Sequence, residues 1–322
     1  MTTAGEGNAT IAPEDGTATA VDVSAMRIAL IGYGEVGGIF GAALAALEVR
    51  GIHAFDILQD DPARGVALRA RAQRDRVEVA PTASAAVADA DFVICAVTAS
   101  ATRAATASIL TALKPGAFLL DINSASPQTK ATCGAMVAAA GGRYVEAAVM
   151  TSVPPHGLRV PMLLGGPDAE AALPMLAALG FAATVVSTTL GVASAIKMCR
   201  SVIVKGMEAI VIESFLTARR YGVEDAVLAS LAETFPGIDW EKQGSYFWQR
   251  VVQHGRRRAE EMRESAATVR EAGLEPFMAG AIADRQAWVS VLAAGGVFAD
   301  APRSADWRTL ADLIARKDMP PA

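Results

Sequence analysis

The chain has 322 residues, of which 52% are apolar, 20% charged and 6% aromatic, and its formal net charge is −5. This length and apolar content suffice for two globular domains, which excludes a chain disordered throughout, and the acidic balance excludes a broad cationic surface for nucleic acid or anionic lipid. No uncharged apolar run reaches the roughly 18 residues that a membrane-spanning helix needs, so an integral membrane protein is not expected.

Residues 1–25 are rich in Ala, Thr, Gly and acidic side chains and show no apolar periodicity. This composition is typical of a disordered tail, and it lacks the basic start and apolar core of a signal peptide. A second methionine, Met26, directly precedes the first strand-like run. We therefore expect a disordered tail over 1–25 and ordered structure from about Arg27.

From residue 26 to residue 189, short β-branched runs alternate with longer Ala-rich amphipathic segments. This alternation is typical of β-α-β units, and nearly continuous apolar runs indicate parallel strands buried on both faces. The expected strands are 27–31, 51–55, 91–97, 117–121, 144–150, 161–164 and 183–187. The expected helices are 36–50, 61–76, 101–113, 127–140 and 168–179. The pattern predicts an α/β domain with a doubly wound, mostly parallel sheet over 26–189.

After Gly191 the strand signals vanish, and about thirty residues run to Tyr221 without proline before Gly222 ends them. At about 1.5 Å per residue, one such helix would be roughly 45 Å long and would need to contact more than one domain or subunit. Further helices are expected at 224–233, 240–253, 256–272, 276–294 and 305–316. We expect residues 190–322 to form an all-α domain that binds substrate and mediates dimerisation.

A glycine-rich turn follows the first expected strand. Residues 32–37 read Gly-Tyr-Gly-Glu-Val-Gly between a strand and a helix, which is the context in which Gly-x-Gly-x-x-Gly binds a dinucleotide pyrophosphate. Asp56 ends the second strand, where a carboxylate can bind the adenosine ribose and repel a 2′-phosphate. This predicts a Rossmann domain that prefers NAD, although Arg64 or Arg69 could favour NADP by folding over the ribose.

Two further strand ends are expected beside the nicotinamide, because parallel sheets bind ligands at the carboxyl ends of their strands. One ends at Val97 and Thr98, and the other continues through Asn123 and Ser124 to a possible helix N-cap at Ser126. The residues expected to bind the cofactor are Gly32, Tyr33, Gly34, Glu35, Val36, Gly37, Asp56, Val97 and Thr98.

The long helix carries a polar stripe inside an otherwise apolar sequence. Its members are Lys197, Arg200, Ser201, Lys205 and Glu208. A lysine there can accept a proton if burial and neighbouring positive charge lower its pKa from about 10.4. For Lys205 and Glu208 we favour a solvated helix face instead.

These residues resemble the β-hydroxyacid dehydrogenase and 6-phosphogluconate dehydrogenase superfamily over the chain from Met26 to its end. Four segments align in order: 31–37 with the nucleotide loop, 121–127 with the substrate segment, 146–152 poorly with a third motif, and 191–197 with the lysine segment. The resemblance implies that Lys197 carries the proton-transfer role. Asn123 replaces a serine of the substrate segment, and Ala193 replaces a glycine of the lysine segment.

Two departures from the superfamily bear on the substrate. Arg200 and Ser201 stand where relatives usually have Asn-Asn or His-Asn, and Val204 stands where the sugar-acid phosphate decarboxylases have glutamate. The resemblance therefore does not extend to decarboxylation.

The arginine run 256–258 could reach an anion from a partner subunit, although paired helix surfaces are the commoner role for such runs. Four aromatic residues should pack a helical core: Trp240, Tyr246, Phe247 and Trp248.

The favoured interpretation is an NAD(P)-dependent dehydrogenase that acts on a small hydroxy acid or sugar acid, with Lys197 as general acid and base. The expected substrate-binding residues are Asn123, Ser124, Thr151, Arg200 and Ser201. An imine reductase or amine-forming enzyme is an alternative, which the presence of the lysine disfavours. The second alternative is a protein that binds a dinucleotide but has no catalytic turnover.

The expected partners are a small anionic substrate and a second copy of the chain, because the long helix needs another surface to cover it. We expect no metal, since three cysteines and three histidines are scattered without ligand spacing. The absence of a disulfide pattern favours a reducing cytoplasm.

Overall fold

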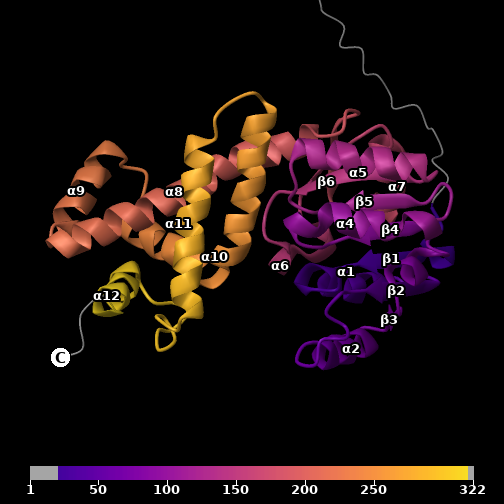
Figure 1. Cartoon of the computed structure of the whole chain (residues 1–322), viewed down its shortest axis with the longest axis horizontal. Coiled ribbons are helices and arrows are strands. Elements are labelled where there is room, and N and C mark those ends of the chain that lie inside the picture. Colours follow the sequence, from indigo (N-terminus) through magenta and orange to yellow (C-terminus); the bar gives the residue numbers. More distant parts are fainter. Residues whose placement is uncertain (1–20, 318–322) are drawn as a thin grey trace, which may run out of the picture.

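The structure, a computed structural model, describes residues 21–317 and consists of a sheet domain followed by a bundle of helices (Figure 1). The expected tail over 1–25 lies mostly outside the described residues. Its last part differs from the expectation, because Val23–Ala25 form a 3-10 helix capped by the side chain of Asp22. That helix leads directly into the first strand.

Eight strands form one sheet in the order β3-β2-β1-β4-β5-β6-β7-β8. They are β1 (Arg27–Ile31), β2 (Gly51–Phe55), β3 (Glu78–Val79), β4 (Phe92–Cys95), β5 (Phe118–Asp121), β6 (Arg143–Val149), β7 (Met162–Gly165) and β8 (Ala183–Ser187). Every neighbouring pair is parallel except β6 with β7. This confirms the doubly wound, mostly parallel sheet.

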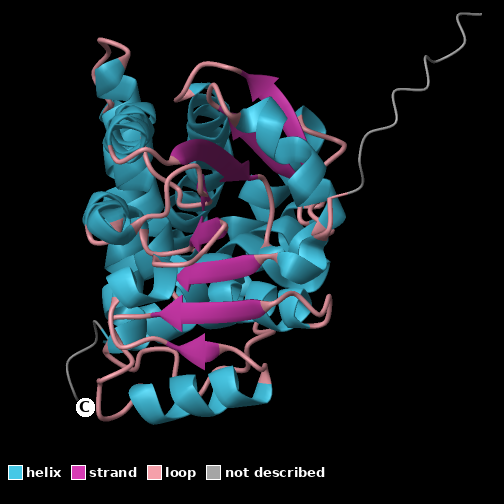
Figure 2. Cartoon of the chain, turned by 90° about the vertical axis from the view of Figure 1, so that its right-hand side faces the viewer, coloured by secondary structure: helices cyan, strands magenta, loops and turns pink. Residues whose placement is uncertain are grey.

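Helices cover both faces of the sheet (Figure 2). They are α1 (Glu35–Ala45), α2 (Gly65–Arg74), α3 (Ala83–Val87), α4 (Thr102–Ala107), α5 (Pro127–Ala139), α6 (Val153–His156) and α7 (Ala169–Ala178). Alternate residues of β1 enter different apolar clusters: Leu30 packs with Phe40 of α1, whereas Ala29 packs in the cluster that contains Val137 of α5. This alternation is what a strand buried on both faces requires.

The second half is helical, as expected. It contains α8 (Val192–Tyr221), α9 (Glu224–Thr234), α10 (Trp240–Glu271), α11 (Phe277–Ala294) and α12 (Trp307–Lys317). α8 leaves the sheet domain and continues into the apolar core of the helical half, where Phe215, Trp248 and Trp307 are buried (Figure 1). Of the four aromatic residues expected in this core, Phe247 and Trp248 are buried, Trp240 packs at its edge, and Tyr246 is half exposed.

The expectation of two helices over 240–253 and 256–272 was wrong, because α10 is continuous. Gly255 lies in the expected gap, and in the structure it is the point where α10 crosses α11. A Cβ atom there would lie 2.8 Å from the backbone oxygen of Gln286, so the glycine permits close helix contact. The short elements β3, α3 and α6 were not expected.

Candidate active site

In the glycine loop after β1, two glycines lie so close to neighbouring backbone that no side chain would fit, and a third faces open space. A Cβ on Gly32 would lie 2.4 Å from the oxygen of Ala96, and one on Gly37 would lie 2.1 Å from the oxygen of Gly32. Gly34 is exposed and has no atom within 4 Å of its Cβ position. The loop therefore keeps clear the space that a close-lying pyrophosphate would take at the start of α1.

Tyr33 stabilises this loop through contacts within the protein. Its side chain is fully buried, with its hydroxyl 3.1 Å from Asp75 Oδ2 and the guanidinium of Arg71 4.7 Å above its ring. Its backbone N–H donates to Asp56 Oδ2 at 2.7 Å, and its carbonyl accepts from Arg71. The polar groups of Tyr33 are thus engaged within the protein, and its expected contact with the cofactor stays a prediction.

Asp56 lies at the end of β2, as expected, and is half-buried. Its second oxygen accepts from the backbone N–H of Leu58 at 2.9 Å, so each carboxylate oxygen holds one loop and retains capacity for a ribose hydroxyl. Arg69 donates to the backbone oxygen of Gln59, and Arg64 is exposed at the start of α2. Arg71, which the sequence reading did not single out, is the arginine that reaches the loop.

The remaining residues expected at the cofactor lie around the same edge of the sheet. Glu35 is exposed in the first turn of α1, and Val36 is half-buried behind it. Val97 follows β4 with Thr98, which is exposed. Together with the open space at Gly34, this edge fits a dinucleotide.

The side chain of Asn123 is buried and bonds to two residues at the end of β4. It is 4% exposed, its Oδ1 accepts from the N–H of Val97 at 2.7 Å, and its Nδ2 donates to Cys95 Sγ at 3.3 Å. Burial raises the pKa of Cys95 to about 12, so this sulfur belongs to a neutral thiol. Asn123 therefore ties the ends of β4 and β5 together, a structural role that was not expected for it.

A buried ionic network lies beneath it. Lys130 and Asp121 are both fully buried, 2.9 Å apart, and Asp121 also accepts from the hydroxyl of Tyr144 at 2.6 Å and from the N–H of Asn123 at 2.9 Å. Buried charges are stable only when they are paired and hydrogen-bonded in this way. The network fixes the loop that carries Ser124.

Lys197 of α8 donates to Ser124 Oγ at 2.6 Å. This contact brings together the two expected residues from opposite halves of the chain. Burial lowers the pKa of Lys197 to about 8; nearby Glu261 opposes this effect, and Lys205, Lys130 and Arg257 add to it. A lysine of this kind can exchange a proton near neutral pH.

Beyond Lys197 the polar stripe of α8 turns inward, so the expected solvated face was wrong. Lys205 is 6% exposed and pairs with Glu261, while Glu208 is 2% exposed and accepts from Arg258 Nε at 2.8 Å. Burial raises the pKa of Glu208, and Arg258 opposes that rise.

The other two arginines of the run are paired as well. Arg256 lies 3.6 Å from Glu260, and Arg257 lies 3.5 Å from Glu261 and 3.8 Å from Glu35 of α1. The commoner role considered for this run, a paired helix surface, therefore describes Arg256 and Arg257, whereas Arg258 is buried against Glu208.

Two carboxylates that the sequence reading missed cap α5. Glu264 accepts from the N–H of Ser126 at 2.8 Å, and Glu271 accepts from the Ser126 hydroxyl at 2.7 Å and from the N–H of Gln128 at 3.0 Å. These donors form the positive end of the helix, which would otherwise attract an anion. The N-terminus of α5 is therefore already occupied by carboxylates of α10. No local signal marks these glutamates, because their partners lie 138 to 145 residues earlier.

The other expected substrate residues are less closely joined. Arg200 is exposed on α8 and Thr151 is exposed after β6, whereas Ser201 is 8% exposed. Among the described residues, no hydrogen bond connects any of the three to Ser124 or Lys197.

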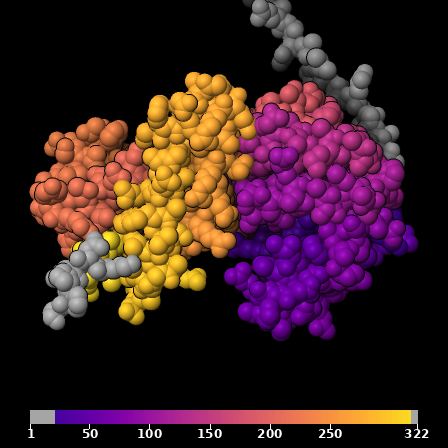
Figure 3. Space-filling view, viewed as in Figure 1, coloured from indigo at the N-terminus to yellow at the C-terminus, as the bar shows by residue number. Residues whose placement is uncertain are grey.

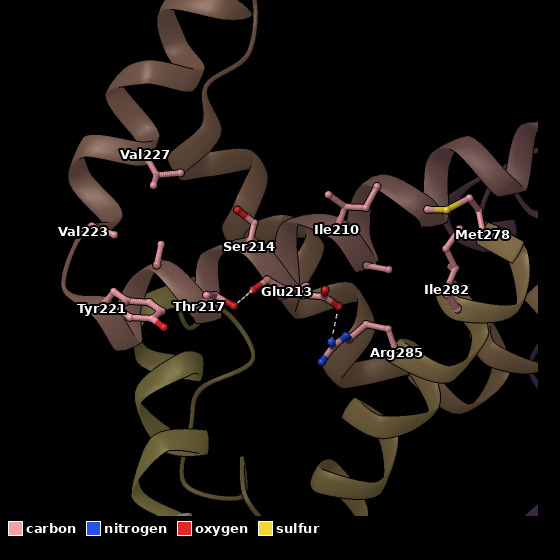
Figure 4. Close-up of a pocket in the computed structure, with 13 residues that line it drawn as sticks. Ile210, Glu213, Ser214, Thr217, Tyr221, Val223, Val227, Met278, Ile282 and Arg285 are labelled. Carbon is pink, nitrogen blue, oxygen red and sulfur yellow. Dashed lines mark hydrogen bonds and ion pairs between the residues drawn. The ribbon is translucent and has the colours of Figure 1, made fainter.

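A separate groove of about 560 Å³ lies between α8, α9 and α11 (Figure 4). Its lining includes Ile210, Tyr221 and Met278, with an ion pair between Glu213 and Arg285. Ile210 lies 13 residues after Lys197 on the same helix, roughly 20 Å further along, so this groove is not the candidate active site.

The chain matches the family described as the NAD binding domain of 6-phosphogluconate dehydrogenase over residues 27–191. Residues 218–289 match a domain of unknown function, DUF1932. An uncharacterised 28.5 kDa protein of Methanothermus fervidus is 30% identical over 162 residues, which is 49% of this chain. That match covers 61% of the Methanothermus protein.

Two solved structures resemble the chain more fully. A conserved hypothetical protein of Sinorhizobium meliloti 1021 is 37% identical, with a TM-score of 0.70, over 91% of this chain and 96% of that one. A protein of unknown function described as similar to 3-hydroxyacid dehydrogenases is 27% identical, with a TM-score of 0.62, over 83% of this chain and 99% of its own. None of the helices within 21–317 is long and apolar enough to cross a membrane.

Proposed function

The chain belongs to the family of the NAD-binding domain of 6-phosphogluconate dehydrogenase, and we propose from this that it is an NAD-dependent oxidoreductase that moves a hydride between nicotinamide and a small hydroxy acid. The observation that carries the proposal is the 2.6 Å contact between Lys197 and Ser124 at the carboxyl edge of the sheet. A lysine with a pKa of about 8 provides a proton-transfer group at the place where the family binds its cofactor.

In the oxidative direction, the bound nicotinamide would accept the hydride from the carbinol carbon. Lys197 Nζ takes the proton of the substrate hydroxyl as that carbon becomes a carbonyl. Ser124 holds the amine and offers its own hydroxyl to the same oxygen, which fixes the direction of proton transfer. In the reductive direction the ammonium group returns the proton.

The acid group of the substrate would meet positive charge on the α8 side of Lys197. Glu264 and Glu271 occupy the N-terminus of α5, so an anion there would meet two carboxylates. Arg200 lies one turn beyond Lys197 and is exposed. We therefore assign the substrate carboxylate to Arg200, with Thr151 as a neutral donor.

NAD is the preferred cofactor of this proposal. Asp56 keeps hydrogen-bonding capacity beside the loop, and the loop that follows it carries Asp60 and Asp61. A 2′-phosphate would meet this negative charge. Arg71 is the cation that reaches the glycine loop, and its positive charge would weaken the preference for NAD over NADP.

We propose that the protein acts as a dimer. α8 exposes three isoleucines spaced seven residues apart, Ile196, Ile203 and Ile210, and α11 exposes Phe277 and Val291. Large apolar side chains exposed on neighbouring helices are typical of a contact surface.

The proposal is tested by following reduced nicotinamide while NAD or NADP is mixed with a panel of hydroxy and sugar acids. Lys197→Ala should lower turnover at least about a hundredfold while affinity for NADH, measured by fluorescence, is retained. Unchanged turnover would refute the role of Lys197. Tight NADH binding without turnover on acids or cyclic imines would favour a non-catalytic protein, and turnover on imines alone would favour the amine-forming alternative.

A further inference from the structure

Glu146 is a fully buried carboxylate in the middle of β6, and its contacts lead to α8. Its Oε1 accepts from the backbone N–H of Ala193 at 2.9 Å, and its Oε2 accepts from the hydroxyl of Ser194 at 3.0 Å. Among the residues 21–317, no lysine or arginine pairs with it. Its partners are therefore the first turn of a helix, whose free N–H groups favour a carboxylate.

α8 has no cap of its own. The residue that precedes it, Gly191, has no side chain to accept a hydrogen bond from the first turn. Glu146 supplies that cap from a strand 47 residues earlier. The cap therefore fixes the start of the helix relative to the sheet.

Lys197 lies one turn after Ala193, on the same side of α8. A shift of the capped turn thus moves the amine relative to Ser124, which belongs to the sheet domain. A displacement of about 1 Å is enough to weaken catalysis strongly when a proton must be transferred along a short contact.

Two neighbouring strands of the sheet hold the two residues of the Lys197–Ser124 contact. Glu146 is the register partner of Asp121 on β5, the residue whose network holds the loop with Ser124. Neighbouring strands thus present two buried carboxylates, one toward the loop of Ser124 and the other toward the helix of Lys197. On the other side of β6, the register partner is Gly165, where a Cβ would lie 2.3 Å from Glu146 Oε1. Only glycine leaves room for the carboxylate.

We propose that Glu146 is a positioning residue, which holds α8 so that the half-buried Lys197 stays against Ser124. This rests on the proposed function only for its effect on turnover, because the position of Lys197 can be measured without a substrate. The other charged groups around Lys197 are Glu261 and Arg257 on α10, Lys130 on α5, and Arg200 and Lys205 on its own helix. None of these changes in the variants below.

The test is an NMR titration of Lys197 in the full chain labelled with ¹³C-lysine, which contains six lysines. The Lys197 signal is assigned by its loss in Lys197→Ala. In the wild type it should titrate near pH 8. Glu146→Ala should raise this midpoint by at least about one pH unit toward the ordinary lysine value, because the released amine regains water.

Three matched variants separate positioning from folding and charge. Gly165→Ala should raise the midpoint in the same way, because its methyl group displaces the flexible end of Glu146 while every charge remains. Glu146→Gln can still bond to both Ala193 and Ser194, so it should keep the midpoint within about 0.3 pH units of the wild type. Glu170→Ala, an exposed change in the first turn of α7, should leave it unchanged.

Turnover should fall at least about tenfold in Glu146→Ala and Gly165→Ala, while NADH affinity stays within about twofold. An unchanged Lys197 midpoint in folded Gly165→Ala would overturn the proposal, as would a shift in Glu146→Gln as large as that in Glu146→Ala. A protein that shows the expected midpoints but no turnover on any substrate would refute the proposed function and leave the role of Glu146 standing.

Discussion

Burial of the Lys197 amine is the main determinant of the pH range in which it can exchange a proton, and the charged side chains around it have smaller, opposing effects. Because burial lowers its pKa from 10.5 to about 8, the neutral base becomes abundant above pH 8. For oxidation, kcat/KM should therefore rise about tenfold per pH unit below pH 8 and level off above it. For reduction, which needs the ammonium, it should be level below pH 8 and fall above. Rate profiles in both directions check this, and a profile flat from pH 6 to 10 would contradict it.

The fully buried pair of Lys130 and Asp121 gives a prediction about stability. Lys130→Met leaves an unpaired buried carboxylate, which should lower the free energy of unfolding by about 3–5 kcal/mol. The control is Lys114→Met, which removes an ion pair with Asp91 whose side chains are 49% and 37% exposed. That change should cost less than about 1 kcal/mol. Urea unfolding measures both, and equal losses would show that burial is not the cause.

At the scale of residues, the sequence singled out Lys197 and Ser124, which the structure brings into contact, but not the residues that hold them. Lys197 and Ser124 were expected because each stands in a motif. The contacts of Asn123 with Val97 and Cys95 were not predicted, because the direction of one polar side chain depends on how the strands pack. The contact of Glu264 with Ser126 could not be predicted, because it forms only when α10 packs against α5.

The glycine loop and α1 give a prediction at the scale of elements. Gly34→Ala adds a methyl group to open space at a φ of −72°, so it should leave the melting temperature within about 2 °C and weaken NADH binding at least about tenfold. Gly37→Ala places its methyl group 2.1 Å from a backbone oxygen and should destabilise the fold itself. Thermal melting and NADH fluorescence titration separate the two effects. Undiminished NADH binding in Gly34→Ala would place the cofactor elsewhere.

Among the elements, periodicity predicted the strands β1, β2 and β8 and the long helices α8 and α11, but it missed β3 and α3 and split α10. The bounds expected for β1, β2 and β8 are those observed, because each is a compact apolar run between turn residues. β3 and α3 escaped notice because two and five residues are too short for a repeat to be seen. The break expected in α10 failed because glycine disfavours a helix locally, whereas here the packing against α11 outweighs that preference.

At the scale of the whole molecule, α10 forms the wall between the two halves. Arg257, Glu261, Glu264 and Glu271 follow one another at spacings of three, four or seven residues and lie on one face of the helix. Along that face they contact α1, α8 and α5 in turn. In Figure 3 a notch opens between the indigo start of the sheet domain and the orange helices. This face of α10 therefore joins the sheet domain to the helical half.

The apolar surface of the helical half predicts a dimer. Ile203 is 66% exposed and Ile210 is 56% exposed on α8. Light scattering should give a mass about twice that of one chain, and Ile203→Glu with Ile210→Glu should reduce it to about one chain, because buried charge opposes the contact. Glu48→Gln, far from this surface, is the control. A wild-type mass of one chain would contradict the dimer.

α8 also restricts where the length of this protein can vary. The helix is held at its start by a carboxylate of β6 and further along by the core of the helical half. One residue inserted between Gly191 and Lys197 would rotate the amine by about 100° around the helix axis and direct it away from Ser124. Insertions and deletions that preserve function should therefore fall in the connections outside 192–221, such as the turn before α9 or the segment between α11 and α12.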